Sequence, residues 1–368
     1  MPQRVYLDYN ATAPIRPEAI AAMVAMMEEG GNPSSIHAAG RAARKRVEDA
    51  RRSVAALIGA DPTRLVFTSG GTEANALALL GSGRPRILYS AIEHDSVRAV
   101  HPDAAAIPVT RDGIIDLAAL EAMLREDDRP AIVSLMLANN ETGIIQPVAA
   151  AADIAHRHGA LIHCDAIQAA GKIPVDVASL AVDFLSLSAH KIGGPPGVGA
   201  LYIAAGLDVV AQQRGGGQER RMRGGTENMP GIAGFGAAAL ASTGGLPALA
   251  EWRDALEAGV RALTPDAVIL GADRERLPNT SCIALSGMKA ETLVMALDLA
   301  GIAVSAGSAC SSGKVAASHV MIAMQQPDAV SGSAIRISLG WRSTQADIDR
   351  FLAAWGDIAR RRKSDRAA

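Results

Sequence analysis

Residues 188–199 read Ser-Ala-His-Lys-Ile-Gly-Gly-Pro-Pro-Gly-Val-Gly, and they connect two short apolar runs. The run before them, residues 183–187 (Asp-Phe-Leu-Ser-Leu), is typical of a short buried strand. A lysine at the end of such a strand, here Lys191, can lose its charge by desolvation, and a neutral lysine amine can form a Schiff base with a carbonyl compound. The other interpretation of the same pattern is a solvated lysine in a surface loop.

The composition is that of an ordinary globular protein with room for two domains: 368 residues, 49% of them hydrophobic and 20% charged. The formal net charge of −2 gives no basic field that would attract nucleic acid or an anionic membrane. The three cysteines form no CxxC pair, which favours a reducing cytoplasm over a disulfide framework. The N-terminus lacks a signal-peptide layout, and no apolar run is long enough to span a bilayer.

Between residues 65 and 203, short apolar strands alternate with helical patterns. The strands are expected near 65–68, 86–89, 107–109, 131–136, 160–165, 183–187 and 200–203. This alternation predicts an α/β fold with a mostly parallel sheet that helices cover on both faces. The pattern changes after residue 225, and we place a domain boundary near residue 250.

Residues 68–75 (Thr-Ser-Gly-Gly-Thr-Glu-Ala-Asn) follow one expected strand and begin a helix. Free N–H groups at that helix start predict a phosphate site, although the stretch is neither a P-loop nor a GxGxxG fingerprint. A Ser/Thr-capped turn is the other interpretation.

The ends of three further strands carry polar side chains. His163 and Asp165 alternate with Cys164, so they share one face of a strand. Together with His156 and His158 they could bind a metal, but Asp165 could instead face the cationic ring nitrogen of pyridoxal phosphate. His94 could stack on a planar cofactor or cap a helix, and Asn140 could bind a ligand or build a turn.

Two candidates lie in the last third of the chain. Cys310 stands in a loop of small residues, where an accessible thiol could be catalytic or idle. Arg336 interrupts an apolar strand, and a lone buried arginine needs an anion such as a substrate carboxylate.

Seven stretches in this order resemble signatures of the cysteine desulfurases, a group of fold-type-I pyridoxal-phosphate enzymes in the class-V aminotransferase family. The stretches are Tyr-Leu-Asp-Tyr-Asn-Ala-Thr (6–12), Gly-Asn-Pro-Ser-Ser (31–35), Phe-Thr-Ser-Gly-Gly-Thr-Glu-Ala-Asn (67–75), Asn-Asn-Glu-Thr-Gly (139–143), Ser-Ala-His-Lys (188–191), Gly-Ser-Ala-Cys (307–310) and Ile-Arg-Ile-Ser-Leu-Gly (335–340). The resemblance is to the nitrogen-fixation and iron–sulfur-assembly group. It implies a large cofactor-binding domain, residues 15–250, and a small domain, residues 1–14 with 251–368, that carries the Cys310 loop.

The resemblance also implies roles for single residues. Lys191 would hold the cofactor as a Schiff base and transfer protons. The remaining cofactor contacts would be His94 stacked on the ring, Asp165 at the ring nitrogen, Gln168 at the ring hydroxyl, and Gly71, Thr72, Ser188 and His190 at the phosphate. Thr226 would reach the phosphate of a second subunit in a homodimer. Asn140 and Arg336 would bind the substrate carboxylate.

The implied reaction converts L-cysteine to L-alanine, with a persulfide left on Cys310. The sulfur would pass to a scaffold or other acceptor protein for iron–sulfur cluster assembly or tRNA thiolation. A selenocysteine lyase, another fold-type-I enzyme, or a sulfur carrier that has lost catalysis are the alternatives. The sequence departs from the family at Ile167, where many relatives have a hydroxyl residue, at Pro195-Pro196, and in residues 313–319 after Cys310.

Overall fold

A computed structural model describes residues 4–243, 248–307 and 318–367, and its centre is a sheet of seven strands in the order β2-β8-β7-β6-β5-β3-β4. The strands are β2 (Leu65–Thr68), β3 (Arg86–Ser90), β4 (Ala105–Ile107), β5 (Ala131–Met136), β6 (Leu161–Asp165), β7 (Phe184–Ser188) and β8 (Gly199–Ile203). β8 runs antiparallel to its two neighbours, β7 and β2. The other neighbouring pairs are all parallel: β7 with β6, β6 with β5, β5 with β3, and β3 with β4. The prediction of an α/β fold with a mostly parallel sheet is confirmed.

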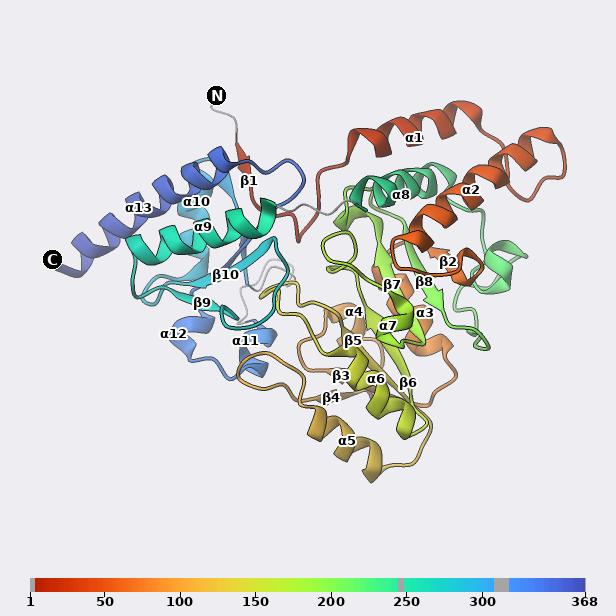
Figure 1. Ribbon diagram of the computed structural model, residues 1–368, viewed down its shortest axis with the longest axis horizontal. Coiled ribbons are helices and arrows are strands. Elements are labelled where there is room, and N and C mark those ends of the chain that lie inside the picture. Colours follow the sequence, from red (N-terminus) through yellow and green to blue (C-terminus); the bar gives the residue numbers. More distant parts are fainter. Residues whose placement is uncertain (1–3, 244–247, 308–317, 368) are drawn as a thin grey trace.

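Helices cover both faces of this sheet, which is why its central strands are buried throughout. The helices are α1 (Pro17–Glu29), α2 (Ala38–Ala56), α3 (Gly71–Gly81), α4 (Asp95–Arg98), α5 (Leu117–Glu126), α6 (Val148–Arg157), α7 (Val177–Leu180) and α8 (Met229–Ser242). One apolar core packs α2, α5, α6 and α8 against the sheet, and a second core packs α3 and α4 against the opposite face (Figure 1).

The rest of the chain builds a second, smaller layer beside the large sheet (Figure 1). Its antiparallel sheet has the order β12-β13-β10-β9, with β9 (Val268–Leu270), β10 (Thr280–Ala284), β12 (Ser305–Ala306) and β13 (Ala334–Ser338), while β1 (Val5–Tyr6) pairs with β11 (Ile302–Ala303). Its helices are α9 (Ala248–Leu263), α10 (Ala290–Leu299), α11 (His319–Ala323), α12 (Asp328–Ser331) and α13 (Gln345–Ala367).

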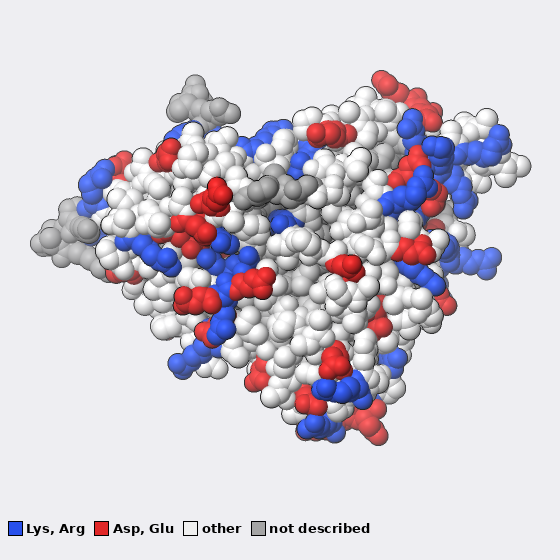
Figure 2. All heavy atoms as spheres, in the orientation of Figure 1, with Lys and Arg blue, Asp and Glu red and all other residues white. Residues whose placement is uncertain are grey.

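The N-terminal strand packs into the apolar core of this second layer. Val5 and Leu7 share that core with Leu256, Phe351 and Trp355. The two-domain division of the chain stays a prediction, and this separate core supports it. Within the described residues, no helix is both long and apolar enough to cross a bilayer. Figure 2 shows acidic and basic side chains interspersed over the visible face.

Candidate active site

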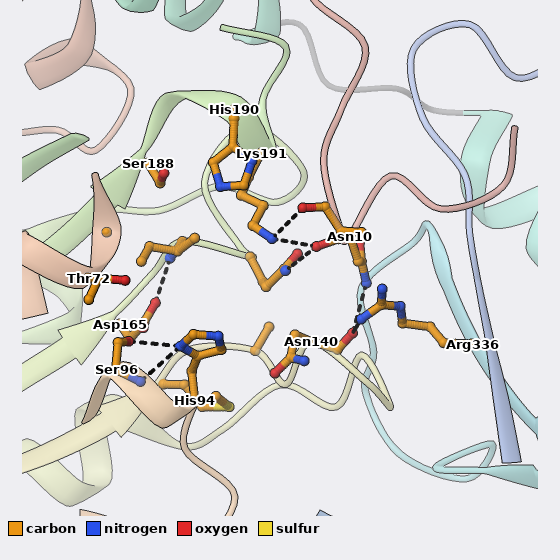
Figure 3. Close-up of a pocket in the computed structure, with 16 residues that line it drawn as sticks. Asn10, Thr72, His94, Ser96, Asn140, Asp165, Ser188, His190, Lys191 and Arg336 are labelled. Atoms are coloured by element: carbon orange, nitrogen blue, oxygen red, sulfur yellow. Dashed lines mark hydrogen bonds between the residues drawn. The ribbon is translucent and has the colours of Figure 1, made fainter. Parts of the chain in front are cut away.

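Lys191 lies just beyond the carboxyl end of β7, in a short 3-10 helix that spans Ala189–Lys191. Its Nζ donates to the backbone oxygens of Asn10, at 2.6 Å, and Ala11, at 2.9 Å. The amine faces a cavity of about 370 Å³ between the two layers (Figure 3). Most of the predicted site residues line this cavity: Gly71, Thr72, His94, Asn140, Asp165, Gln168, Ser188, His190, Lys191 and Arg336.

One end of the cavity is built from hydroxyls and a helix start. Thr72 lies in the first turn of α3, and Ser188 ends β7 on the same side of the cavity (Figure 3). A Cβ at Gly71 would collide with Cδ1 of Ile167, so glycine here allows Ile167 to pack close to the start of α3. Burial and the nearby Lys191 charge lower the pKa of His190 to about 4. This end therefore offers uncharged donors and free N–H groups to an anion.

Asp165 and His94 are connected through a side chain that sequence reasoning did not assign. Nδ2 of Asn75, one turn into α3, donates to Oδ2 of Asp165 at 2.8 Å and to Oγ of Ser96 at 2.9 Å. The Ser96 N–H donates to Nδ1 of His94 at 3.1 Å. A neutral His94 therefore carries its proton on Nε2.

Burial raises the pKa of Asp165, while hydrogen bonds from Asn75 and the Ile167 N–H and the charges of His94 and Lys191 oppose that rise. Burial and these interactions thus act on the Asp165 pKa in opposite directions. A further cation beside the carboxylate would stabilise its charged form.

The two asparagines in the turn after β5, Asn139 and Asn140, have different roles. Oδ1 of Asn139 accepts from the N–H groups of Glu141, at 3.0 Å, and Thr142, at 2.9 Å, so Asn139 builds the turn. The Asn140 side chain is left to line the cavity (Figure 3). Its backbone oxygen accepts from Nη1 of Arg336 at 3.1 Å.

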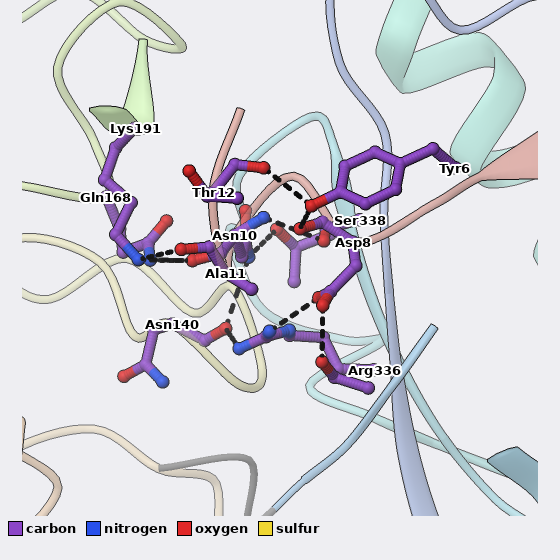
Figure 4. Close-up of polar contacts among 12 residues, drawn as sticks. Tyr6, Asp8, Asn10, Ala11, Thr12, Asn140, Gln168, Lys191, Arg336 and Ser338 are labelled. Carbon is purple, nitrogen blue, oxygen red and sulfur yellow. Dashed lines mark hydrogen bonds and ion pairs between the residues drawn. The ribbon is translucent and has the colours of Figure 1, made fainter. Parts of the chain in front are cut away.

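Arg336 is not the lone arginine that its strand context suggested, because Nη2 also donates to Oδ1 of Asp8 at 2.8 Å (Figure 4). The guanidinium nevertheless keeps a buried Nε without a hydrogen-bond acceptor in the part of the chain that the structure describes.

Two predicted residues are not placed in this cavity. Thr226 is exposed and lines a separate hollow with Thr68, Ser69 and Arg223. Cys310 lies outside the described residues, as do residues 308–317 around it.

The metal interpretation of His163 receives no support. His163 lies within 2.8 Å of the hydroxyls of Ser134 and Ser186, on the two neighbouring strands. Across residues 4–243, 248–307 and 318–367, no group of three or more histidine, cysteine or acidic side chains could hold a metal ion.

The aminotransferase class-V family model matches residues 5–351. This chain belongs to the class-V aminotransferase family. A cysteine desulfurase of Cereibacter sphaeroides is 48% identical over 95% of this chain and 94% of its own length. An IscS-like cysteine desulfurase of Mycobacterium tuberculosis is 39% identical over 99% of this chain and 98% of its own length. The crystal structure of a NifS-like protein from Rickettsia africae superposes with a TM-score of 0.90 at 34% identity, covering 97% of this chain and 99% of that one.

Class-V enzymes are pyridoxal-phosphate-dependent, and the cavity fits that cofactor. It provides an amine for the aldehyde at Lys191, a buried carboxylate that can accept from the ring nitrogen at Asp165, and hydroxyls beside a helix start for the phosphate. The volume also lies within the ordinary range for small-molecule sites. The chain is therefore a fold-type-I enzyme whose site can hold pyridoxal 5'-phosphate.

Sequence reasoning missed three residues that line or support this class-V site: Asp8, Asn10 and Asn75. Asn75 stands three residues after Thr72 in a helix, a spacing that places both on one face and could have revealed it. Asp8 and Asn10 reach the site from a segment more than 100 residues distant in sequence from their partners. No local pattern marks such long-range contacts.

Proposed function

We propose that this class-V enzyme is a cysteine desulfurase. It removes sulfur from L-cysteine, releases L-alanine and leaves a persulfide on Cys310. The C–S bond of the substrate breaks, a S–S bond to Cys310 forms, and the carbon that loses sulfur takes up a proton. The observation that carries the proposal is one cavity that combines the Lys191 amine, the buried Asp165 carboxylate and the Arg336 guanidinium.

When bound, pyridoxal phosphate supplies an electron sink that weakens bonds at the substrate α-carbon. The chain's own residues supply the rest. Lys191 holds the cofactor aldehyde and carries the α-proton, since its amine faces the cavity. His94 and Gln168, which both line the cavity, would hold the cofactor ring and its hydroxyl. Arg336 and Asn140, which both line the cavity, bind the substrate carboxylate.

The described cysteines leave Cys310 as the candidate nucleophile. Cys164 and Cys282 are both buried and free of disulfides. Burial is the largest cause that raises the pKa of each thiol, so neither presents a thiolate to the cavity. Of the three cysteines in the sequence, Cys310 therefore remains.

The finer parts of the proposal concern assembly and partners. The enzyme is a cytoplasmic homodimer in which exposed Thr226 contacts the cofactor phosphate of the other subunit. Its persulfide sulfur passes by thiol exchange to an acceptor, either an iron–sulfur scaffold or a protein that serves tRNA thiolation. The similarity to a cysteine desulfurase and to an IscS-like cysteine desulfurase supports the sulfur-transfer part of this proposal.

The activity is tested by adding L-cysteine and a thiol reductant to the cofactor-loaded protein and measuring sulfide and alanine together. We expect Cys310→Ala to lose both products and Cys282→Ala, a matched cysteine removal in β10, to retain them. A Cys310→Ala variant that still releases alanine from selenocysteine points to a selenocysteine lyase instead. Protein that shows no spectral change with cysteine points to a sulfur carrier without catalysis.

The shared site is tested by complementation. Lys191→Ala and Thr226→Ala variants are each expected to be inactive, but a mixed dimer has one site with both residues intact. Co-expression of the two should therefore recover part of the activity. No recovery in isolated mixed dimers contradicts the role of Thr226 across subunits.

A further inference from the structure

Behind the cavity wall, a second lysine contacts two residues that surround Lys191. Nζ of Lys172 donates to Oε1 of Gln168 at 2.7 Å and to Oδ1 of Asn10 at 2.9 Å. Lys172 itself does not line the main cavity, whereas Gln168 and Asn10 do. Lys172 therefore makes no direct contact with a ligand there, and its hydrogen bonds reach the cavity only through these neighbours.

The contacts determine which way the Gln168 amide points. The backbone oxygen of Asn10 can only accept a hydrogen bond, so the amide nitrogen faces it, and the amide oxygen faces the Lys172 amine whether or not that amine is charged. The amide nitrogen then faces the other way, and it donates to the backbone oxygen of Asn10 at 2.9 Å (Figure 4). Rotating the amide by half a turn would point its nitrogen at Lys172 and its oxygen at the Asn10 oxygen. Both contacts would then be lost.

We propose that Lys172 is a positioning residue, which holds the Gln168 amide with its nitrogen toward the ring oxygen of the bound cofactor. The proposal rests on the assignment of Gln168 to that oxygen under the proposed function. An N–H donor stabilises negative charge on the ring oxygen, whereas an amide oxygen in the same place would repel it. Lys172 thereby tunes the cofactor without touching it.

The surroundings of Lys172 explain how a second amine is tolerated beside Lys191. Burial, followed by the charges of Lys191 and Arg336, lowers the pKa of Lys172 well below its usual range. An amine that has lost its proton still has two N–H bonds. The two acceptors, on Gln168 and Asn10, use both.

The test is a double-mutant cycle read from the bound cofactor, with no need for turnover. We expect Lys172→Met to raise the midpoint of the cofactor's absorbance change with pH by about 0.5 to 1 unit. The reason is that a ring oxygen with one hydrogen bond fewer is more basic and retains its shared proton to higher pH. The same variant should weaken cofactor binding to the apoprotein about 3- to 10-fold.

The Gln168→Ala background supplies the decisive comparison. There, Lys172→Met should cause no further shift, because the residue through which it acts is gone. Lys172→Arg, which keeps N–H donors, should restore the wild-type midpoint. Lys45→Met is the matched control, since Lys45 lies on the surface of α2 and pairs with Asp49.

A Lys172→Met shift that persists undiminished in the Gln168→Ala background overturns the proposal, as does an unchanged midpoint in folded Lys172→Met protein. Thermal unfolding of each apoprotein establishes folding, and Lys172→Gln replaces Lys172→Met in the cycle if the latter does not fold. Wild-type protein that binds the cofactor but releases no sulfide from cysteine contradicts only the proposed function. The cycle remains readable in that case.

Discussion

Nη2 of Arg336 lies 2.8 Å from Oδ1 of Asp8, although 328 residues separate them in the chain. The other oxygen of Asp8 accepts from the Ser305 hydroxyl at 2.7 Å, so the carboxylate is fixed from two sides. Figure 4 shows the Arg336 guanidinium held between Asp8 and the backbone oxygen of Asn140. Asp8 thus holds a buried guanidinium in one orientation before any substrate arrives, which reduces the entropic cost of binding a carboxylate.

The first prediction concerns the shape of that guanidinium. Arg336→Lys keeps the charge but cannot contact Asp8, the Asn140 oxygen and a substrate carboxylate at once. We expect the KM for cysteine to rise roughly 10- to 100-fold, the value of a charge-assisted hydrogen bond. Cofactor affinity should be unchanged. Steady-state kinetics together with a cofactor titration check this, and a fall in kcat with unchanged KM would contradict it.

The second prediction concerns Asn75. Its hydrogen bond to Asp165 lowers the pKa of that carboxyl, so Asn75→Ala should raise it further. A smaller fraction of Asp165 is then ionised at low pH, and the acid limb of kcat/KM should move upward by about one pH unit. The pH profile of kcat/KM measures the shift. Ser82→Ala, at the far end of α3, is the control and should leave the acid limb in place.

Much of this cavity could be predicted from sequence because its residues follow the ends of strands. Asp165 ends β6, and Ser188 to Lys191 follow from β7. The carboxyl ends of parallel strands meet at one edge of a sheet, so strand order alone brings such residues together. Short apolar runs bounded by glycine or polar residues were sufficient to locate those strands.

The N-terminal contribution could not be predicted in the same way. Asn10 contacts Gln168, Lys172 and Lys191 across more than 150 residues of chain. Such contacts depend on how the two layers pack, and residue periodicity carries no information about that packing. The role of Lys172 was hidden for the same reason, since a single lysine in a turn is usually solvated.

The third prediction concerns Glu141, a buried carboxyl whose Oε2 accepts from the Ser318 hydroxyl at 2.5 Å. Burial raises its pKa to about 7, from 4.5. The folded state therefore binds this proton more tightly than the unfolded state, and the associated stability is lost as pH rises from about 4.5 through 7. Glu141→Gln removes that loss.

We expect Glu141→Gln to be more stable than wild type at pH 8.5 by up to about 3 kcal/mol, with the difference shrinking toward zero near pH 4.5. Urea unfolding of the apoproteins at several pH values measures it. A stability difference between variant and wild type that is the same at all pH values would show that the pKa of Glu141 is equal in the folded and unfolded states.

The fourth prediction concerns His163, which lies between the hydroxyls of Ser134 and Ser186 in the middle of the large sheet. Burial lowers its pKa to about 3, from 6.5. Between those values the unfolded state binds more protons, so the free energy of unfolding falls as pH falls from about 6.5 toward 3. The slope from this group approaches about 1.4 kcal/mol per pH unit.

His163→Gln should flatten this dependence while lowering the stability at pH 7, because glutamine cannot bridge the two serines with the same geometry. Urea unfolding of both apoproteins at pH 7.0 and 5.0 gives the comparison. Wild-type and variant proteins that lose the same free energy over that interval would refute the assignment. Measuring the difference between them removes the contribution of other groups, such as His190.

The fifth prediction concerns a buried ion pair under the large sheet. Arg51 donates to both oxygens of Glu219, at 2.7 and 2.8 Å, and both side chains are buried. The same carboxylate accepts from the Phe67 N–H at 2.8 Å. Glu219 adopts a positive φ of 42°, which a non-glycine residue rarely does, so these contacts hold strained backbone in place. Glu219→Ala leaves the buried guanidinium with only the more exposed Glu48 as an acidic partner, 3.2 Å from Nε, so it should cost up to about 3–5 kcal/mol.

The double variant Arg51→Met with Glu219→Leu separates the effect of the buried charges on stability from the effect of the hydrogen bond that Glu219 accepts from the Phe67 N–H. It removes the ion pair as a unit, and an apolar replacement of a buried pair is often close to neutral. The Phe67 N–H, however, loses its acceptor, which costs about 1–3 kcal/mol. We therefore expect the double variant to be more stable than Glu219→Ala but less stable than wild type, in urea unfolding at fixed protein concentration. A double variant as unstable as the sum of its single variants would show that the two residues act independently.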